Sequence, residues 1–384
     1  MATRYAGMDG GDRYFGYRDM MRLLWICSTV PPYNSFLFRA LSENPGISLR
    51  VVVNELAETR HPWKHDLTRG LNLRPIRRVA GIDWGLLREA IWSKNTLVTI
   101  AGWNVPAVIL FVSLLAAKRA AFVLWTDTPD LDSPRHPIKA ALRSRWLRWI
   151  FSRALAVMGT GSPALDALRQ MGCPEGKMLN FPFFVDLEHY SKSGVPSVTD
   201  KELHFLSLGR IENAVKGHHL AVEALGRVVE RTGRIDWKYT IAGIGPDSDE
   251  LLSMIASRGL AKQIILVGWL EPEEVRDFLR VSDVLIHPSL QDAYPAAVLE
   301  AMASGTPVLG SNAAGSVLDR VEHMKNGCVH TAGDVSELSE QIEWVLQHRD
   351  AVDDMGRAAR ITAESWPVSK AVKIITSLTN ISDT

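Results

Sequence analysis

The most informative stretch of the sequence, residues 283–310, reads DVLIHPSLQDAYPAAVLEAMASGTPVLG. The apolar run at 284–286 ends in a His-Pro-Ser turn, which predicts a short buried strand. Residues 296–303 are strong helix formers closed by a Ser-Gly pair, and another apolar run follows at 306–309. The order strand, loop, helix, strand predicts a βαβ unit. Ligands of open α/β sheets bind at the carboxyl ends of such strands.

Two acidic residues lie in this unit with seven residues between them. Asp292 is in the loop, and Glu300 is inside the helix, flanked by apolar side chains. A carboxylate is rarely buried without a partner, and the free backbone N–H groups around Ala296 and Ala297 favour an anion. The pattern therefore indicates a ligand site. The alternative is a surface glutamate and a loop aspartate in an ordinary α/β domain.

The spacing Asp292-x7-Glu300, followed by Ala-Met-Ala-Ser-Gly-Thr-Pro-Val, resembles the E-x7-E signature of retaining glycosyltransferases of family four. The resemblance covers residues 200–330 well and the first half only loosely. Two features depart from the family pattern. The first acid is Asp instead of Glu, and Ala-Tyr-Pro at 293–295 replaces Gly-Phe-Gly. The resemblance implies the GT-B fold, in which two Rossmann-like α/β domains face a cleft.

Length and composition fit such an architecture. The 384 residues are enough for two domains, and 46% hydrophobic and 22% charged residues are typical of a soluble globular protein. The first 20 residues are polar and do not form a signal peptide, and the most apolar run, 105–117, is too short to span a bilayer. Three scattered cysteines predict neither a disulfide framework nor a zinc site, and they fit a reducing, cytoplasmic compartment.

Strands and helices alternate on both sides of a polar segment, which predicts a linker between two doubly wound parallel sheets. The expected parts are a loose tail at 1–20, an acceptor-side domain at 21–190, a linker at 191–202, a nucleotide-sugar-binding domain at 203–365 and a last helix within 366–384. In the resembled family this last helix crosses back onto the first domain. Strands are predicted, among others, at 22–27, 48–53, 96–100, 121–125, 156–158, 204–208, 237–241 and 264–267.

Candidate chemistry gathers at strand ends of the second domain. Gly209 and Arg210 end its first strand, and Lys216 follows in a loop before a helix. Two cations at such ends suit a diphosphate, because Arg offers a planar fork and Lys a point charge. Surface Arg and Lys are common, so the assignment depends on the resemblance, in which this pair matches the residues that bind the donor phosphates.

The resemblance implies a role for each candidate. Arg210 and Lys216 would hold the diphosphate of a nucleotide sugar and stabilise the leaving group. Glu300 would accept hydrogen bonds from the ribose hydroxyls, and Asp292 would contact hydroxyls of the transferred sugar.

The remaining contacts to the donor are also implied by the resemblance. Backbone N–H groups near Ala296 and Ala297 would meet the phosphate or sugar, and the base would rest near Trp269 and Leu270. No metal and no cofactor is expected. The acidic triplets at 130–132 and 247–249 are typical of solvated loops, and the His pair at 218–219 has no evident third ligand.

The acceptor side carries weaker signals. Asp127 follows a predicted strand and is the best acidic candidate, and His136 is the nearest histidine. The alternative is that either residue only shapes its loop. No general base is evident. In the resembled family the leaving diphosphate itself can take the proton of the acceptor.

Residues 136–154, HPIKAALRSRWLRWIFSRA, predict a basic helix. Apolar side chains recur on one side at helical spacing: Ile138, Leu142, Trp146, Trp149 and Ile150. Residues 1–190 hold 24 basic and 16 acidic residues, a net charge of +8, and the rest of the chain carries −8. These features predict a peripheral enzyme on the inner, anionic face of a membrane. The alternatives are a core helix with solvated arginines, and two halves that attract each other.

Three hypotheses follow. The first is a retaining, metal-independent glycosyltransferase that places a sugar on a glycan or lipid-linked acceptor in surface polysaccharide or glycolipid assembly, with no nucleic-acid partner. The second is a nucleotide-sugar epimerase of the same fold, which should carry an additional carboxylate–histidine cluster in the cleft. The third is a non-catalytic binding protein, which the departures at 292–295 allow and the intact Arg210, Lys216 and Glu300 oppose.

Overall fold

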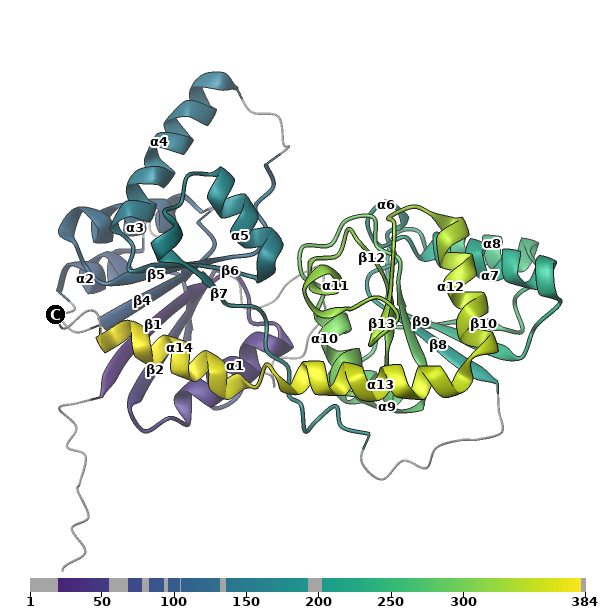
Figure 1. Ribbon diagram of the computed structural model, residues 1–384. Coiled ribbons are helices and arrows are strands. Elements are labelled where there is room, and N and C mark those ends of the chain that lie inside the picture. The colour runs from purple at the N-terminus through teal and green to yellow at the C-terminus, as the bar shows by residue number, and fades with distance from the viewer. Residues whose placement is uncertain are drawn as a thin grey trace, which may run out of the picture.

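The computed structural model describes residues 20–54, 68–77, 83–92, 96–103, 105–131, 136–192 and 202–380. Residues 1–19 of the predicted tail and 193–201 of the predicted linker lie outside the described residues, as does Asp132 of one acidic triplet. The described chain forms two parallel sheets, each covered by helices (Figure 1). The predicted fold class of two Rossmann-like α/β domains is confirmed.

The first sheet has the strand order β3-β2-β1-β4-β5-β6-β7, and all neighbours pair in parallel. Its central strand buries Leu23 through Cys27, as expected for a parallel sheet with both faces covered. The strands are β1 (Met21–Cys27), β2 (Ile47–Val53), β3 (Leu73–Pro75), β4 (Thr96–Ala101), β5 (Phe122–Thr126), β6 (Ala156–Gly159) and β7 (Met178–Asn180).

Five helices cover this sheet within the described residues. They are α1 (Pro32–Ser42), α2 (Trp84–Trp92), α3 (Pro106–Lys118), α4 (Pro137–Arg153) and α5 (Gly161–Gln170). Helix α1 begins four residues earlier than the periodicity at 36–42 predicts, because proline is favoured in the first helical turn. Across the described parts of the chain, no helix has both the length and the apolar character that crossing a membrane requires.

The second sheet has the order β10-β9-β8-β11-β12-β13, again all parallel. Its strands are β8 (Leu203–Leu208), β9 (Trp237–Ala242), β10 (Ile264–Gly268), β11 (Val284–His287), β12 (Val308–Ser311) and β13 (Gly327–His330). The βαβ unit predicted from 283–310 is β11, α10 (Ala296–Ala303) and β12, with the helix at its predicted bounds. Because β8 and β11 are neighbours, the loops that follow them meet at one edge of the sheet.

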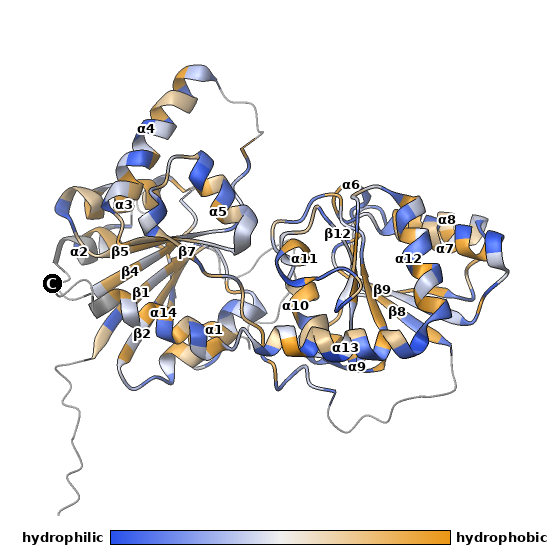
Figure 2. Cartoon of the chain, viewed as in Figure 1, coloured by the Kyte–Doolittle hydropathy of each residue, from blue (hydrophilic) through white to orange (hydrophobic). Residues whose placement is uncertain are grey.

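The helices of the second domain and the end of the chain complete the fold. They are α6 (Asn213–Lys216), α7 (His218–Thr232), α8 (Ser248–Ser257), α9 (Pro272–Val281), α11 (Gly315–Arg320), α12 (Val335–Gln347), α13 (Arg349–Glu364) and α14 (Val368–Asn380). Helix α14 lies beside α1 of the first domain. Figure 2 shows that apolar residues concentrate on the strands and the inner sides of the helices. One buried apolar cluster includes residues of both domains, among them Phe183, Tyr294 and Ile375.

Helix α4 corrects the prediction of a single apolar face. Ile150 is fully buried under the first domain, and Trp146 Nε1 donates a hydrogen bond to Ser113 of α3 at 2.9 Å. By contrast, Ile138 and Leu142 are 65% and 64% exposed. The helix extends beyond the sheet (Figure 1), so only its C-terminal half has a core to pack against.

Candidate active site

A pocket of about 170 Å³ opens between the domains at the carboxyl ends of β8, β9 and β10. The second domain contributes most of its lining, including the strand-end residues Gly209 and Arg210 and the start of α10. The first domain contributes Pro32 and Tyr33 from the start of α1. Of the predicted donor-site residues, these line the pocket: Gly209, Arg210, Trp269, Leu270, Ala296 and Glu300.

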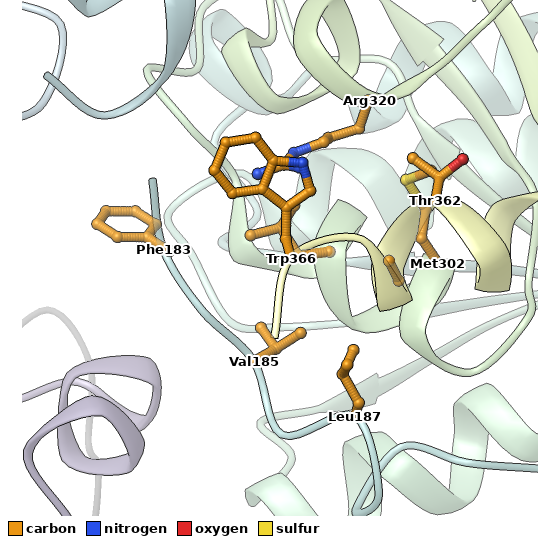
Figure 3. A pocket seen from close by; sticks show the side chains of 9 residues that line it. Phe183, Val185, Leu187, Met302, Arg320, Thr362 and Trp366 are labelled. Carbon is orange, nitrogen blue, oxygen red and sulfur yellow. The ribbon is translucent and has the colours of Figure 1, made fainter. Parts of the chain in front are cut away.

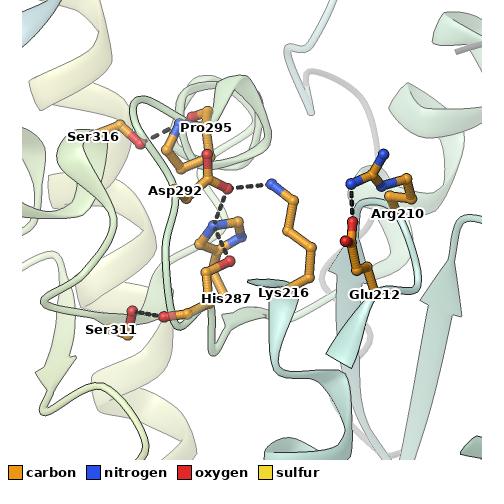
Figure 4. A network of polar contacts seen from close by, with 9 residues as sticks. Arg210, Glu212, Lys216, His287, Asp292, Pro295, Ser311 and Ser316 are labelled. Atoms are coloured by element: carbon orange, nitrogen blue, oxygen red, sulfur yellow. Dashed lines mark hydrogen bonds and ion pairs between the residues drawn. The ribbon is translucent and has the colours of Figure 1, made fainter. Parts of the chain in front are cut away.

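Lys216 and Asp292 form an ion pair beside this pocket (Figure 4). The loop after β11 is tied to α6, since the N–H groups of Leu290 and Gln291 donate to Val215 O at 2.8 and 3.2 Å. Gly217 permits this approach, because its φ of 66° is left-handed and a Cβ there would overlap the carbonyl of Pro288. The chain thus brings together two residues that are 76 positions apart.

His287, which sequence analysis did not select, orients Asp292. Its Nε2 lies 3.1 Å from Asp292 Oδ2 and 3.0 Å from Ser289 Oγ. Burial raises the pKa of Asp292, but the hydrogen bond to His287 and the charge of Lys216 outweigh burial and hold the pKa below its usual value. Asp292 is therefore an ionised carboxylate at neutral pH, with a fixed orientation.

Arg210 pairs with Glu212, two residues further along the chain (Figure 4). Its side chain is 28% exposed, and that of Lys216 is 22% exposed. Both cations are therefore near solvent and occupied by carboxylates of the same chain. An anion that binds here has to replace those carboxylates or join them.

Glu300 is hydrogen-bonded to Tyr190, a second residue that the sequence did not indicate. Burial raises the pKa of Glu300 to about 7, although the hydrogen bond from Tyr190 opposes the rise. A glutamate in this range exchanges its proton near neutral pH, which perturbed groups at functional sites often do. Tyr190 also lines the pocket.

Asp127 follows β5 on the first domain's side of the cleft. Asp127 is exposed to solvent, but neighbouring groups partly desolvate its carboxylate, and this effect with the charge of Asp292 raises the pKa to about 6 against an opposing hydrogen bond to Thr160. The charge of Asp292, on the opposite domain, therefore acts on this carboxylate. His136 is exposed at the start of α4 and does not line the pocket, and Ala297 is partly buried against the core.

The acidic triplets and the His pair, which were not expected to bind a metal, have structural roles or no described role. Asp247 Oδ2 accepts a hydrogen bond from the backbone N–H of Asn213 at 2.6 Å, which fixes the loop before α6. His218 is buried, and burial lowers its pKa to about 3, so it is neutral. Within the described residues, no group of three or more His, Cys, Asp or Glu side chains is arranged to hold a metal ion.

Comparisons with known proteins show which sequences and folds this chain resembles. Residues 192–362 match the family model described as "Glycosyl transferases group 1". The chain is 26% identical over 302 residues to the D-inositol 3-phosphate glycosyltransferase of Paenarthrobacter aurescens, covering 74% of this chain and 71% of that one. It is 29% identical over 201 residues to an amylovoran biosynthesis glycosyltransferase of Erwinia amylovora, covering 51% and 48%.

A solved structure extends the likeness to the whole fold. The Anabaena protein HepE, crystallised with UDP, matches with a TM-score of 0.73 at 16% identity, covering 95% of this chain and all of that one. At this identity the match shows the fold. Residues 192–362 are thus similar to glycosyl transferases of group 1, and the whole chain shares the two-domain fold of the solved structure.

Proposed function

We propose that the protein is a retaining, metal-independent glycosyltransferase that moves a sugar from a nucleotide sugar to a glycan or glycolipid. The observation that carries the proposal is the convergence of Arg210, Lys216, Asp292 and Glu300 at the edge of one interdomain pocket. Cations, an oriented carboxylate and a partly buried glutamate are groups that suit a sugar diphosphate. Relatives named for amylovoran biosynthesis and colanic acid biosynthesis support surface polysaccharide or glycolipid synthesis as the context.

In the proposed complex the diphosphate lies between Arg210 and Lys216. Phosphate oxygens carry more charge than Glu212 and Asp292 and can bind both cations at once, so the donor competes well for them. The free N–H groups at the start of α10 face the same pocket through Ala296 and add a favourable helix dipole. The two cations take the place of a metal at the leaving group.

Glu300 binds the ribose in this proposal. Its ionised carboxylate accepts hydrogen bonds from two vicinal hydroxyls, and the base rests against Trp269 and Leu270 at the end of β10. Ribose binding then favours the ionised form of a group whose pKa lies at about 7. Tyr190 donates to the same carboxylate and helps to orient it.

The reaction breaks the bond between the anomeric carbon and the diphosphate, and the bonding pair leaves with the diphosphate. Arg210 and Lys216 stabilise the charge that develops on this leaving group. The acceptor hydroxyl attacks the same face of the sugar, and its proton passes to the departing diphosphate. Asp292 holds hydroxyls of the donor sugar, and Asp127 binds the acceptor from the first domain.

The acceptor side of the proposal includes a membrane surface. On α4, the exposed Ile138, Leu142 and Trp149 share one face with Arg145. Exposed apolar and aromatic side chains beside basic ones suit an anionic membrane. We therefore place the enzyme in the cytoplasm, bound peripherally to the inner face of the membrane and near a lipid-linked acceptor.

One observation favours a second candidate function. The hydrogen-bonded Asp292–His287 pair, with Asp127 opposite, is a carboxylate–histidine cluster of the kind that a nucleotide-sugar epimerase of this fold needs. An epimerase transfers no sugar, so it converts one nucleotide sugar to another without any acceptor.

Incubation with a panel of nucleotide sugars tests the proposal. A glycosyltransferase releases nucleoside diphosphate faster when an extract containing acceptors is present, and it leaves the anomeric configuration of the sugar unchanged in the product. Conversion of one nucleotide sugar into an isomeric nucleotide sugar, with no dependence on an acceptor, favours the epimerase. Binding without conversion of any donor favours a non-catalytic protein.

A further inference from the structure

The two domains touch closely where α5 meets the loop after β11. The Tyr294 ring and the Asp319 carboxylate of the second domain lie against Gly161, and a Cβ on that glycine would overlap both side chains. Gly161 has a left-handed φ of 83°. The Asp319 carboxylate accepts hydrogen bonds from the backbone N–H of Ser162, at 2.9 Å to Oδ2, and from its hydroxyl. An acid at the N-terminus of α5 also interacts favourably with the helix dipole.

The second-domain side of this contact is bonded directly to the loop of Asp292. The N–H of Asp292 donates to Ala313 O, and the N–H of Gly315, at the start of α11, donates to Asp292 O, both at 3.1 Å. Ser316 Oγ donates to Pro295 O at 2.9 Å. Tyr294 is only two residues from Asp292. A movement of α11 against the first domain therefore moves the backbone that carries this carboxylate.

Tyr294 continues the connection towards the end of the chain. Its hydroxyl accepts a hydrogen bond from Arg320 Nε at 3.2 Å, and its ring meets Phe183 edge-on at 5.9 Å. The Arg320 guanidinium stacks on the Trp366 ring at 3.9 Å, where the chain crosses from α13 to α14 (Figure 3). The contact thus includes the segments that join the domains, near Phe183 and near Trp366.

We propose that Gly161 and Ser162 of the first domain, with Tyr294 and Asp319 of the second, form an interdomain clamp that positions Asp292 for the reaction. The clamp also explains why Tyr294 stands where the resembled signature has a phenylalanine, since its hydroxyl binds Arg320. Tyr294 and Asp319 are positioning residues, because they act through the backbone of Asp292. The effect on turnover rests on the proposed function, whereas the effect on domain closure does not.

Four variants of the full chain test the clamp. Gly161→Ala places a Cβ against Tyr294 and Asp319, and Gly233→Ala is its matched control, with a left-handed φ of 68° but open space around the Cβ. Asp319→Ala removes the contact to Ser162, and Asp354→Ala is the matched control in an exposed ion pair with Arg357. Small-angle scattering of the free proteins measures domain separation, and donor turnover gives kcat and KM.

Gly161→Ala should increase the radius of gyration and lower kcat more than tenfold, with the KM for the donor changing less than threefold. Asp319→Ala should lower kcat about three- to tenfold, because its hydrogen bonds lie partly in solvent. Both controls should match the wild type in both measurements. If Gly161→Ala does not fold, the measurements on Asp319→Ala alone test the clamp.

Wild-type dimensions and turnover in the clamp variants would overturn the proposal, as would an equal loss in Gly233→Ala, which would show backbone strain alone. A wild type that converts no donor refutes the proposed function instead. The change in radius of gyration between Gly161→Ala and Gly233→Ala then still tests the clamp, and equal radii would refute it.

Discussion

The two sides of the cleft differ in how their charged groups are held. On the second domain, Lys216 is paired with Asp292, which His287 also contacts, and Arg210 is paired with Glu212. On the first domain, the Asp127 carboxylate is hydrogen-bonded to the Thr160 hydroxyl, and the negative charge of Asp292 helps to raise its pKa. The second-domain side thus holds compensated charges, and the first-domain side holds a carboxylate with a raised pKa. In the proposed function, donor binding depends on these paired charges and on the ionisation of Glu300, and acceptor binding depends on the ionisation of Asp127.

The largest effect is expected at the compensated pairs. Lys216→Ala removes a cation from the diphosphate and leaves the partly buried Asp292 without its ion pair. A charged hydrogen bond contributes about 1.5–3 kcal/mol, so kcat/KM for the donor should fall roughly tenfold to over a hundredfold. Arg210→Ala should lower kcat/KM for the donor by a factor in the same range. Lys325→Ala, in an exposed pair with Glu322, is the control, and wild-type kinetics in Lys216→Ala would contradict the donor site.

Glu300→Gln should have the next largest effect, on donor affinity and on the pH dependence of stability. Its folded pKa of about 7 lies above the usual value of 4.5 for a glutamate, so the folded state binds the proton more tightly. The free energy of unfolding should therefore decrease as pH rises from about 4.5 to 7, and this decrease should be absent in Glu300→Gln. Donor binding requires the ionised form, so donor affinity should increase from pH 6 to 8 in the wild type only.

Calorimetric titration at those two pH values measures donor affinity, and denaturant unfolding across the same range measures stability. At pH 8, Glu300→Gln should bind the donor about tenfold more weakly, because one charged acceptor is lost. If the free energy of unfolding changes with pH equally in the wild type and in Glu300→Gln, the titrating group is another residue.

Asp127→Asn should affect transfer to the acceptor much more than donor binding. Transfer to the acceptor should fall about tenfold, whereas donor binding stays within about twofold, because the charges on the diphosphate are unchanged. With a pKa of about 6, wild-type transfer should decline as pH falls below 6, and the variant should lack this decline. Steady-state rates with saturating donor across pH 5–8 provide the measurement. A parallel loss of donor affinity would place Asp127 on the donor side.

Membrane binding should affect location more than chemistry. Replacement of Arg143, Arg145 and Arg148 by Gln should reduce co-sedimentation with anionic liposomes several-fold and leave donor hydrolysis unchanged. Raised salt should release the wild type, since screening shortens the electrostatic reach to about 3 Å near 1 M. Neutral liposomes are the control. Wild-type protein that stays in the supernatant with anionic vesicles at low salt would make a lipid-linked acceptor untenable.

The smallest effect is expected from metal removal. Cationic side chains already occupy the position next to the proposed diphosphate, so EDTA should change turnover less than twofold. Loss of activity with EDTA and recovery with manganese would show that an acidic cluster of the chain takes part.

The sequence by itself determined the elements and the edge at which the site lies. Local periodicity and capping residues define strands such as β11 and the helix α10, which has its predicted bounds, because such signals act over one or two turns. Parallel strands end at one edge, so Arg210 and the start of α10 could be placed at that edge, and the family resemblance implied that they serve one donor site.

Only the tertiary structure decided which side chains meet. Tyr190 reaches Glu300, and Asp319 reaches Ser162, over separations of more than a hundred residues for which no local pattern exists. The apolar side chains of α4 show the same limit. Ile138 and Ile150 both fit one helical pattern, yet Ile138 is exposed and Ile150 is buried, because the sheet extends under only half of the helix. Packing between distant segments fixes these contacts, and that information is spread over the whole chain.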